Sequence, residues 1–357
     1  MLQEAIKKSN KTFSTTLLKW NKDQNKRKMP WKGEKDPYKI WVSEIILQQT
    51  RVNQGLAYYD AFVARFPTIH MLARANERSV LKQWEGLGYY TRCRNLISTA
   101  RFISKDLKGE FPSTYDSIKT LKGIGPYTAS AIASFAYNLP YAVVDGNVFR
   151  VLSRVFGINT PMDTSAGKAF FTTLANQLLD KKNPGLYNQA IMDFGATVCK
   201  PKPLCQDCVF KKKCFAFINE QIEALPVKFK TLKIKQRWLY YLVIHYKNSF
   251  PIVQRTQRDI WQQLYEFPLI ETNKSLSIPQ VLKEAIRRGW LIQGDYSLTE
   301  ISKPITQRLS HQLISAHFIT VNVMKGSMFP RHWTWITENA MNKYPFPKSI
   351  KEYLDRI

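Results

Sequence analysis

The sequence predicts a mainly α-helical N-terminal part followed by a smaller α+β part, and three observations support this division. From about residue 13 to 216, apolar residues recur at helical spacing and strand signals are scarce. Four of the five cysteines then fall within residues 199–214. After Cys214, short runs rich in aromatic and β-branched residues begin. At 357 residues with 44% hydrophobic content, the chain is too long for one ordinary core and too apolar for disorder.

The N-terminal part is expected to contain about ten helices separated by short breakers. The breakers are Phe111-Pro112-Ser113, Gly123-Ile124-Gly125 and Asn183-Pro184-Gly185. The segments with helical periodicity are IWVSEIILQQT (40–50), SVLKQWEGLGYYTRCRNLISTARFI (79–103), SIKTLKGIGPYTASAIASFAY (117–137) and KAFFTTLANQLL (168–179).

The C-terminal part begins after a basic, mixed segment near residues 220–235, which is expected to be a linker. Residues 238–246 (WLYYLVIHY) and 250–256 (FPIVQRT) have the composition of short strands. Residues 278–290 (IPQVLKEAIRRGW) have the pattern of a helix. Strands mixed with a helix predict a small α+β domain.

The charge of the chain favours a polyanionic partner. Lys and Arg number 53 against 27 Asp and Glu, which gives a formal net charge of +26. Nucleic acid is the leading interpretation, and a merely soluble basic protein is the alternative. An anionic membrane surface fits less well because no basic amphipathic helix stands alone. The sequence also lacks a long apolar run and a secretory signal, so a soluble intracellular protein is expected.

The segment LKGIGPYTA (121–129) has the pattern of a helix-hairpin-helix. Gly123 and Gly125 allow a tight turn, and they can bring backbone N–H groups at a helix N-terminus against a DNA phosphate. The alternative is a glycine-bearing turn between helices that binds nothing.

Two carboxylates stand where glycoside cleavage could use them. Asp145 precedes an apparent helix start and is interpreted either as an N-cap or as the group that stabilises a sugar cation. Glu44 lies among apolar residues that would raise its pKa and keep a proton available for the leaving base, unless it is a solvated residue of a helix face. Gln48 is expected on the same helical face as Glu44, and with Gln49 and Thr50 it could fill a gap in a base stack.

The cysteine run has gaps of five, two and five residues and indicates a metal site. Four thiolates this close suit either a [4Fe–4S] cluster or a tetrahedral zinc, and the lysines between them favour a nearby phosphate. The four candidate ligands are Cys199, Cys205, Cys208 and Cys214. Cys93, which stands alone, is expected to be a packing residue.

The segment GLGYYTRCRNL (86–96) combines aromatic rings with cations. Tyr89, Tyr90, Arg92 and Arg94 suit stacking on bases and binding phosphates. The alternative places the tyrosines in a core.

Together these segments resemble the MutY-type adenine-DNA glycosylases, within the endonuclease III superfamily of helix-hairpin-helix glycosylases. The resemblance covers nearly the whole chain, because PWKGEKDPYKIWVSEIILQQTRV, GLGYYTRCRNL, LKGIGPYTA, VVDGNVFRVLSR, YNQAIMDFGATVC and the cysteine run occur in the family's order. It implies a helical glycosylase region over 1–220, a linker over 221–235 and a Nudix-like recognition domain over 236–357. Within the first region it implies a six-helix module over 27–134 and a [4Fe–4S] module formed by 1–26 and 135–220.

The resemblance also implies roles for individual residues. Glu44 matches the acid that protonates adenine, and Asp145 matches the carboxylate that stabilises the sugar cation before water adds. Residues that match supporting or DNA-contacting positions are Tyr127 and Asn147 at the catalytic site, Trp31 in the segment lining the adenine pocket, and Gln49, Thr50, Leu87 and Tyr89 around the orphaned opposite base.

Tyr127 occupies the position where the bifunctional endonuclease III branch carries its lysine nucleophile. A phenol cannot form a Schiff base, so the resemblance implies base removal without strand cleavage. The segment IWQQLYEFPLIE (260–271) is similar to a landmark of the family's Nudix-like domain, and no Nudix catalytic box is visible. Ser310 and His311 match the loop that inspects 8-oxoguanine.

Three positions depart from the family pattern. The first cysteine gap has five residues where six are usual, which makes the cluster geometry at Cys199 less secure. Lys32 follows Trp31 where arginine is common, so a planar fork is lost while the charge is kept. Leu309 stands where a phenylalanine is usual.

The expected protein is therefore a monofunctional glycosylase that excises adenine opposite 8-oxoguanine or guanine in double-stranded DNA. It is expected to be a monomer that does not associate with a membrane. Its expected location is the bacterial cytoplasm, in association with the nucleoid. Two rival interpretations stay open. One is a thymine–guanine mismatch glycosylase, and the other is a non-catalytic DNA-binding iron–sulfur or zinc protein.

Overall fold

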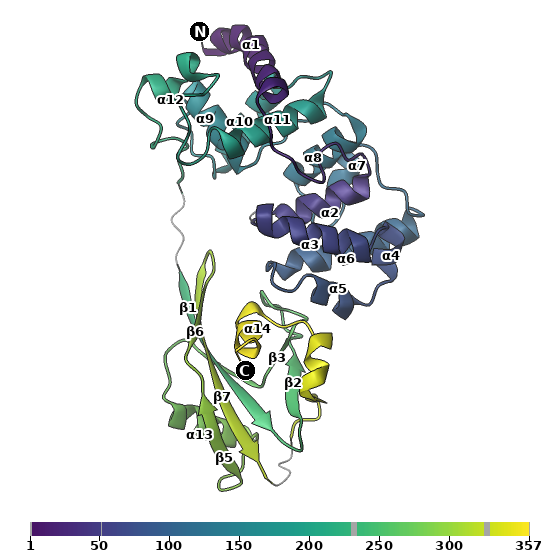
Figure 1. Ribbon diagram of the computed structural model, residues 1–357, viewed down its shortest axis with the longest axis vertical. Helices are drawn as coiled ribbons and strands as arrows, with labels where there is room; N and C mark the ends of the chain where they lie inside the picture. Colours follow the sequence, from purple (N-terminus) through teal and green to yellow (C-terminus); the bar gives the residue numbers. More distant parts are fainter. Residues whose placement is uncertain (1, 51, 230–233, 325–328, 357) are drawn as a thin grey trace. The chain divides into compact units, whose positions relative to one another are not determined.

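The computed structural model describes residues 2–50, 52–229, 234–324 and 329–356 (Figure 1). Its residues group into two compact units, one formed by 1–73 with 98–230 and the other by 74–97 with 231–357. The boundaries expected at 220 and 236, and the division at 27–134, stay predictions. Part of the expected linker, residues 230–233, lies outside the described residues.

The N-terminal part is mainly helical, as predicted, with twelve α-helices in the described stretch up to residue 218 rather than about ten. The additional helices are short ones that carry too few turns to show a periodic pattern. The helices are α1 (Leu2–Asp23), α2 (Pro37–Leu47), α3 (Val52–Arg65), α4 (Ile69–Arg74), α5 (Glu77–Gln83), α6 (Tyr90–Asp106), α7 (Tyr115–Lys119), α8 (Pro126–Tyr137), α9 (Gly146–Phe156), α10 (Ser165–Leu178), α11 (Pro184–Thr197) and α12 (Phe215–Ile218), with a 3-10 helix at Lys211–Lys213.

The first unit is built on a core between its first and last long helices. Phe13, Leu17 and Trp20 of α1 pack with residues of α9, α10 and α11, and the ring of Trp20 meets Phe194 edge-on at 4.9 Å. Helix α2 packs on α8, and α8 packs on α7 and α11. This packing brings the residues after Trp31, the middle of α2 and the starts of α8 and α9 into one region of the unit.

The second unit contains the predicted α+β domain. The strands are β1 (Lys235–His245), β2 (Phe250–Gln254), β3 (Tyr265–Glu266), β4 (Leu269–Thr272), β5 (Tyr296–Ile301), β6 (Ile305–Arg308), β7 (Gln312–Val323) and β8 (Thr334–Ile336). The helices are α13 (Ile278–Arg287) and α14 (Lys348–Leu354), with a 3-10 helix at Glu338–Lys343. Both predicted strands and the predicted helix are thus confirmed.

A mixed five-stranded sheet forms the centre of this domain. Its order is β4-β1-β7-β5 with β6 also paired to β7, and β1 runs parallel to β7. A smaller sheet has the order β3-β2-β8. Tyr240 of β1 pairs with His317 of β7, and Phe318, the next residue, faces the opposite side of the sheet. Tyr240 accordingly packs towards α13, whereas the ring of Phe318 stacks on Tyr353 of α14 at 4.1 Å. Both faces of the sheet are therefore covered.

Among the helices that the structure describes, none combines the length and the continuous apolar composition that a membrane span requires. The expected location in the cell and the monomeric state stay predictions.

Candidate active site

Glu44 lies in the middle of a buried helix. Asp36 caps the start of α2 by accepting the N–H of Tyr38, and Pro37 occupies its first turn. The side chain of Glu44 is only 5% exposed, so the alternative of a solvated residue is wrong. Burial raises the pKa of Glu44 to about 7, the hydrogen bond from Tyr127 opposes this rise, and the nearby Asp145 adds to it. A substantial fraction of the Glu44 carboxyl is therefore protonated at neutral pH.

Tyr127 holds this carboxyl from the start of α8. Its hydroxyl donates to Glu44 Oε2 at 2.8 Å. Burial and the two carboxylates Glu44 and Asp145 raise the pKa of Tyr127 well above its usual value, so the phenol keeps its proton. Because Oε2 accepts this bond, Oε1 is the oxygen left to carry a transferable proton.

Asp145 is the N-cap of α9, as one of its two interpretations predicted. Its Oδ1 accepts the Val148 N–H at 2.8 Å, and its Oδ2 accepts Asn147 Nδ2 at 2.7 Å. Burial raises the pKa of Asp145, while the hydrogen bonds from Val148 and Asn147 lower it. The cap does not exclude catalysis, because the same two bonds fix the carboxylate near Glu44.

Arg150 links Asn147 to the first cysteine. One guanidinium nitrogen, Nη2, donates to Asn147 Oδ1 and to the carbonyl of Gly195, both at 2.8 Å. The Nε atom donates to the carbonyl of Cys199 at 2.7 Å. The amide of Asn147 is thereby held in one orientation from both sides.

Glu44 and Trp31 line the same cavity of about 270 Å³. The indole of Trp31 is fixed edge-on against Tyr59 at 5.6 Å. Asp145 and Tyr127 do not line this cavity. The residues that do are Trp31, Lys32, Gly33, Glu34, Lys35, Ile40, Ser43, Glu44, Phe135, Gly185, Leu186 and Gln189.

A fully buried carboxylate that binds two residues of the cavity wall, Lys32 and Gln189, was not predicted from the sequence. Asp193 of α11 forms ion pairs with Arg27 at 2.8 Å and with Lys32 at 3.1 Å. It also accepts hydrogen bonds from Asn25 and Gln189. The planar fork that arginine would offer at position 32 is replaced here by an ammonium tied to Asp193. The available signal was an acidic residue inside the apolar segment YNQAIMDFGATVC.

The glycine hairpin has the predicted conformation. Gly123 has a φ of +82°, which only glycine adopts at little cost, and Gly125 precedes α8. A side chain at Gly125 would meet open space, so the backbone there is open to a ligand.

Gln48, Gln49 and Thr50 lie beyond α2, and one prediction about them was wrong. Helix α2 ends at Leu47, and Gln48 has a ψ of 116°, so Gln48 does not continue the helical face of Glu44. Its amide instead donates to Thr128 Oγ1 at 3.2 Å. Gln49 is exposed with a φ of 58°.

The four cysteines line one small cavity, together with Arg154 and several apolar side chains. The buried Arg154 donates to Cys199 Sγ at 3.8 Å and to the carbonyls of Lys200 and Pro201. Within the described ranges, no three His, Cys, Asp or Glu side chains are grouped closely enough to hold a metal ion. Cys93 is fully buried, and burial raises the pKa of its thiol, which fits a packing residue.

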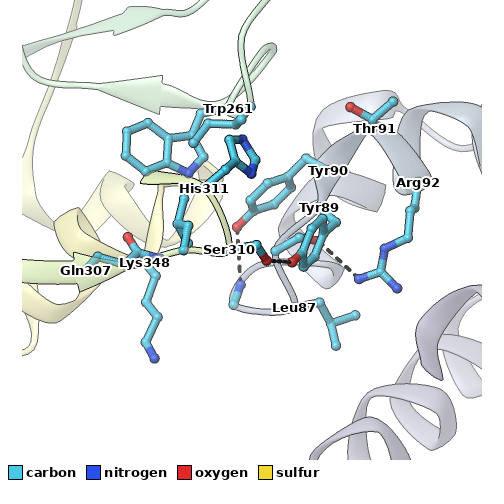
Figure 2. A pocket seen from close by; sticks show the side chains of 14 residues that line it. Leu87, Tyr89, Tyr90, Thr91, Arg92, Trp261, Gln307, Ser310, His311 and Lys348 are labelled. Atoms are coloured by element: carbon cyan, nitrogen blue, oxygen red, sulfur yellow. Dashed lines mark hydrogen bonds between the residues drawn. The ribbon is translucent and has the colours of Figure 1, made fainter. Parts of the chain in front are cut away.

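Within the second unit, Leu87 and Tyr89 lie across a cavity of about 300 Å³ from Ser310 and His311 (Figure 2). The Tyr89 hydroxyl is 3.0 Å from Ser310 Oγ. Tyr89 is exposed, whereas Tyr90 is 2% exposed and belongs to the core, so the core interpretation holds for Tyr90. Stacking of Tyr89 on bases stays a prediction.

The two cations of this segment do not extend freely. The guanidinium of Arg92 lies over the rings of Trp84 and Tyr89, and Arg94 donates to the carbonyl of Gln262 at 2.7 Å. Both are therefore engaged by their own unit rather than presented to phosphates.

Comparison with known proteins agrees with this arrangement. Residues 42–172 match the HhH-GPD superfamily of base excision DNA repair proteins, and residues 239–356 match the NUDIX domain. A thermostable thymine-DNA glycosylase of known structure is 30% identical over 59% of this chain and 98% of its own, with a TM-score of 0.55. A trapped endonuclease III–DNA complex shares the fold at 18% identity, covering 60% of this chain and 98% of its own, with a TM-score of 0.52.

These matches and the site define the class, a helix-hairpin-helix DNA N-glycosylase of base excision repair with an appended Nudix-like domain. The adenine DNA glycosylase of Buchnera aphidicola subsp. Baizongia pistaciae (strain Bp) is 33% identical over 97% of this chain and 96% of its own length. The human adenine DNA glycosylase is 42% identical over 57% of this chain and 39% of its own length. The chain belongs to the adenine DNA glycosylase family.

Proposed function

We propose that this protein excises adenine mispaired with 8-oxoguanine or guanine from double-stranded DNA and leaves an abasic site. The observation that carries the proposal is Glu44, a carboxyl buried beside a cavity of about 270 Å³ with its pKa raised to about 7. A neutral acid at the wall of such a cavity is suited to protonating a base that has left the helix.

The reaction begins when adenine leaves the stack, which costs a few kcal/mol and is easiest at a mispair. Trp31 offers an aromatic edge and face to the base in the cavity. Glu44 donates its proton from Oε1 to a ring nitrogen while Tyr127 holds Oε2. Protonation makes adenine a better leaving group, and the glycosidic bond then breaks.

Asp145 stabilises the positive charge that develops on the sugar. Its two hydrogen bonds, from Val148 and Asn147, fix the carboxylate before the charge appears, so little reorganisation is needed. Water then adds to the sugar cation and gives up a proton, which the Glu44 carboxylate left by the first step accepts. Tyr127 cannot form the Schiff base that a lysine would form, so the strand stays intact.

The opposite base is inspected from two places on the chain. Leu87 and Tyr89 line one side of the cavity in Figure 2, and Ser310 and His311 line the other, which gives hydroxyl and imidazole groups for the edge of 8-oxoguanine. Gln48, Gln49 and Thr50 fill the gap that the departed adenine leaves.

Binding to the duplex is supported by charge and by the hairpin. A net charge of +26 attracts any duplex, and the exposed backbone at Gly123 and Gly125 offers N–H groups to a phosphate. The proposed partner is thus double-stranded DNA that contains the mispair, bound by a monomer.

We further propose that Cys199, Cys205, Cys208 and Cys214 hold a [4Fe–4S] cluster. The donor set fits, because all four sulfurs line one cavity. Burial raises the pKa of the Cys199 and Cys208 thiols, and the hydrogen bonds that Arg154 and the Phe210 N–H donate to their sulfurs oppose this rise. A four-iron cluster also spreads its ligands more widely than a single zinc ion does. When bound, it would supply a rigid fold to a loop rich in lysines. Iron analysis with absorbance near about 400 nm tests this, and zinc without iron would contradict it.

The deciding experiment is single-turnover base release from duplexes that differ only at the central pair. The pairs are adenine opposite 8-oxoguanine, adenine opposite guanine, thymine opposite guanine and adenine opposite thymine. We expect fast release of adenine from the first two, with strand breakage only after alkali. Release of thymine would instead favour the activity named for the 30% identical structure, and release of nothing would favour a non-catalytic binding protein.

A further inference from the structure

A partly buried ion pair between Lys82 and Glu85 connects the end of α5 to the C-terminal segment of the second unit. The side chain of Glu85 is 6% exposed. Its Oε1 accepts the N–H of Phe346 at 2.8 Å, and its Oε2 accepts Lys82 Nζ, also at 2.8 Å. Lys82 Nζ in turn donates to the carbonyl of Tyr344 at 3.0 Å. The pair thus binds the backbone of residues 344–346 at two points.

That backbone is joined firmly to the core of the α+β domain. The N–H of Tyr265 in β3 donates to the carbonyl of Pro345 at 2.9 Å. The ring of Phe346 is 1% exposed and stacks with Phe267 at 6.4 Å. Helix α14 begins two residues later, at Lys348. The segment that Glu85 binds at Phe346 is therefore also bound to the smaller sheet and continues into α14.

On its other side, Glu85 adjoins the loop that forms one wall of the cavity in Figure 2. Gly86, Gly88 and Tyr89 of this loop have φ values of +94°, +73° and +48°. Across the cavity, the bond between Tyr89 and Ser310 is exposed to water. A buried hydrogen bond to a charged group is stronger than an exposed bond between neutral groups. The bond between Glu85 and Phe346 therefore fixes the spacing of the two cavity walls more firmly than the bond between Tyr89 and Ser310 does.

We propose that Glu85 is a positioning residue that sets the separation between the loop at 86–89 and the loop at 309–311. By holding Phe346 it determines where Tyr89 and Ser310, whose hydroxyl oxygens lie 3.0 Å apart, meet the edge of the opposite base. Discrimination between 8-oxoguanine and guanine then depends on a carboxylate that contacts neither. The inference rests on the proposed function of this cavity.

The test compares Glu85→Ala with Glu85→Gln. The measured quantity is the ratio of single-turnover adenine release opposite 8-oxoguanine to release opposite guanine. We expect Glu85→Ala to lower this ratio about tenfold, because a buried charge-assisted hydrogen bond is lost. Glu85→Gln keeps a carbonyl oxygen for the Phe346 N–H and should keep most of the ratio. Glu110→Gln, which changes an exposed glutamate of the first unit, is the matched control.

Hydrogen exchange at the Phe346 amide provides a readout that does not depend on activity. It should be protected in the wild type and in Glu85→Gln and should exchange faster in Glu85→Ala. A wild-type ratio in Glu85→Ala together with faster exchange would overturn the proposal. If the wild type releases adenine opposite neither 8-oxoguanine nor guanine, the proposed function fails, and amide exchange alone then decides whether Glu85 holds this segment. Equal release opposite both bases in the wild type would leave the proposed function standing and would overturn this inference.

A second substitution guards against loss of folding in Glu85→Ala. Lys82→Met removes the ammonium that binds Tyr344 but leaves the carboxylate and its bond to Phe346. It should lower the ratio in the same direction by a smaller factor. An unchanged ratio in Lys82→Met, when Glu85→Ala cannot be folded, would count against the proposal.

Discussion

At the scale of single residues, the environment of Glu44 determines its chemistry. An ionised carboxylate in an apolar helix face is costly, and the hydrogen bond from Tyr127 reduces that cost only in part. The pKa therefore rises from 4.5 to about 7. The same burial that makes Glu44 a useful acid makes it destabilising when it loses its proton.

This gives a stability prediction for Glu44→Gln. The folded protein keeps a proton at Glu44 that the unfolded chain releases, so stability is fully present below pH 4.5 and falls as pH rises to about 7. Over that range the loss is about 3 kcal/mol. Glutamine does not titrate, so the variant should gain on the wild type by about 2 to 3 kcal/mol between pH 5 and pH 8.

Denaturant unfolding at the two pH values measures this difference. Adenine release should meanwhile slow by about a hundredfold or more, because the amide has no acidic proton to donate. Glu110→Gln, which changes an exposed glutamate of the same unit, serves as the control. If the free energy of unfolding of Glu44→Gln differed from that of the wild type by the same amount at pH 5 and pH 8, Glu44 would not be a buried acid with a raised pKa.

Asp145 allows capping to be separated from catalysis. Asp145→Asn keeps an oxygen that can accept the Val148 N–H, so the variant should stay folded within about 1 kcal/mol of the wild type. It loses the negative charge, so adenine release should fall by about a hundredfold or more while DNA binding persists. Single-turnover release and fluorescence anisotropy measure the two effects. Release at the wild-type rate would show that Asp145 is only a cap.

At the scale of elements, periodicity predicted the long helices but not where each one stops. The segment predicted to be helical extends to Thr50, yet α2 ends at Leu47. Short helices such as α5 and α7 were missed as separate elements because they begin at caps, Asn76 and Thr114, that one sequence cannot distinguish from ordinary loop residues. Local spacing thus identifies helix-forming stretches, whereas the ends depend on single side chains.

The same limit explains which site residues were missed. Glu44, Asp145 and the cysteines stand out because their type is unusual for their surroundings. Asp193 becomes informative only when α11 packs beside the residues around Arg27 and Lys32. That packing joins segments more than 160 positions apart, and no periodicity within either segment reports it.

Close packing between α9 and α11 gives a prediction for Gly195→Ala. An added Cβ would lie 2.7 Å from the Cβ of Asn147 and 3.0 Å from its carbonyl oxygen. One of the two helices must shift, which should cost about 1 to 3 kcal/mol of stability. Because Asn147 holds Asp145, adenine release should slow as well.

Thermal unfolding and single-turnover release test this pair of effects. Gly146→Ala is the control for stability, since its added Cβ meets open space. A Gly195→Ala protein with normal stability and a normal rate would show that α9 and α11 tolerate a wider spacing.

At the scale of the whole molecule, composition and the change from helical periodicity to strand-like runs predicted two domains. The sequence did not indicate that residues 74–97 group with the C-terminal part. Lys82 and Glu85 have the spacing of a solvated pair on a helix surface, and only the distant backbone of residues 344–346 gives them another role. Contacts over this sequence distance leave no local pattern.

The net charge of +26 predicts how affinity and specificity respond differently to salt. Each phosphate neutralised releases counterions, so affinity for any duplex should fall by about a hundredfold or more between about 50 and 200 mM salt. Contacts to base edges release no counterions, so the preference for adenine opposite 8-oxoguanine over adenine opposite thymine should stay constant. Anisotropy titrations of both duplexes at several salt concentrations measure the two slopes. Plots of log affinity against log salt concentration that run parallel for the two duplexes would assign the attraction to phosphates and the selectivity to the pocket residues. Plots that converge would mean that charge itself contributes to the discrimination.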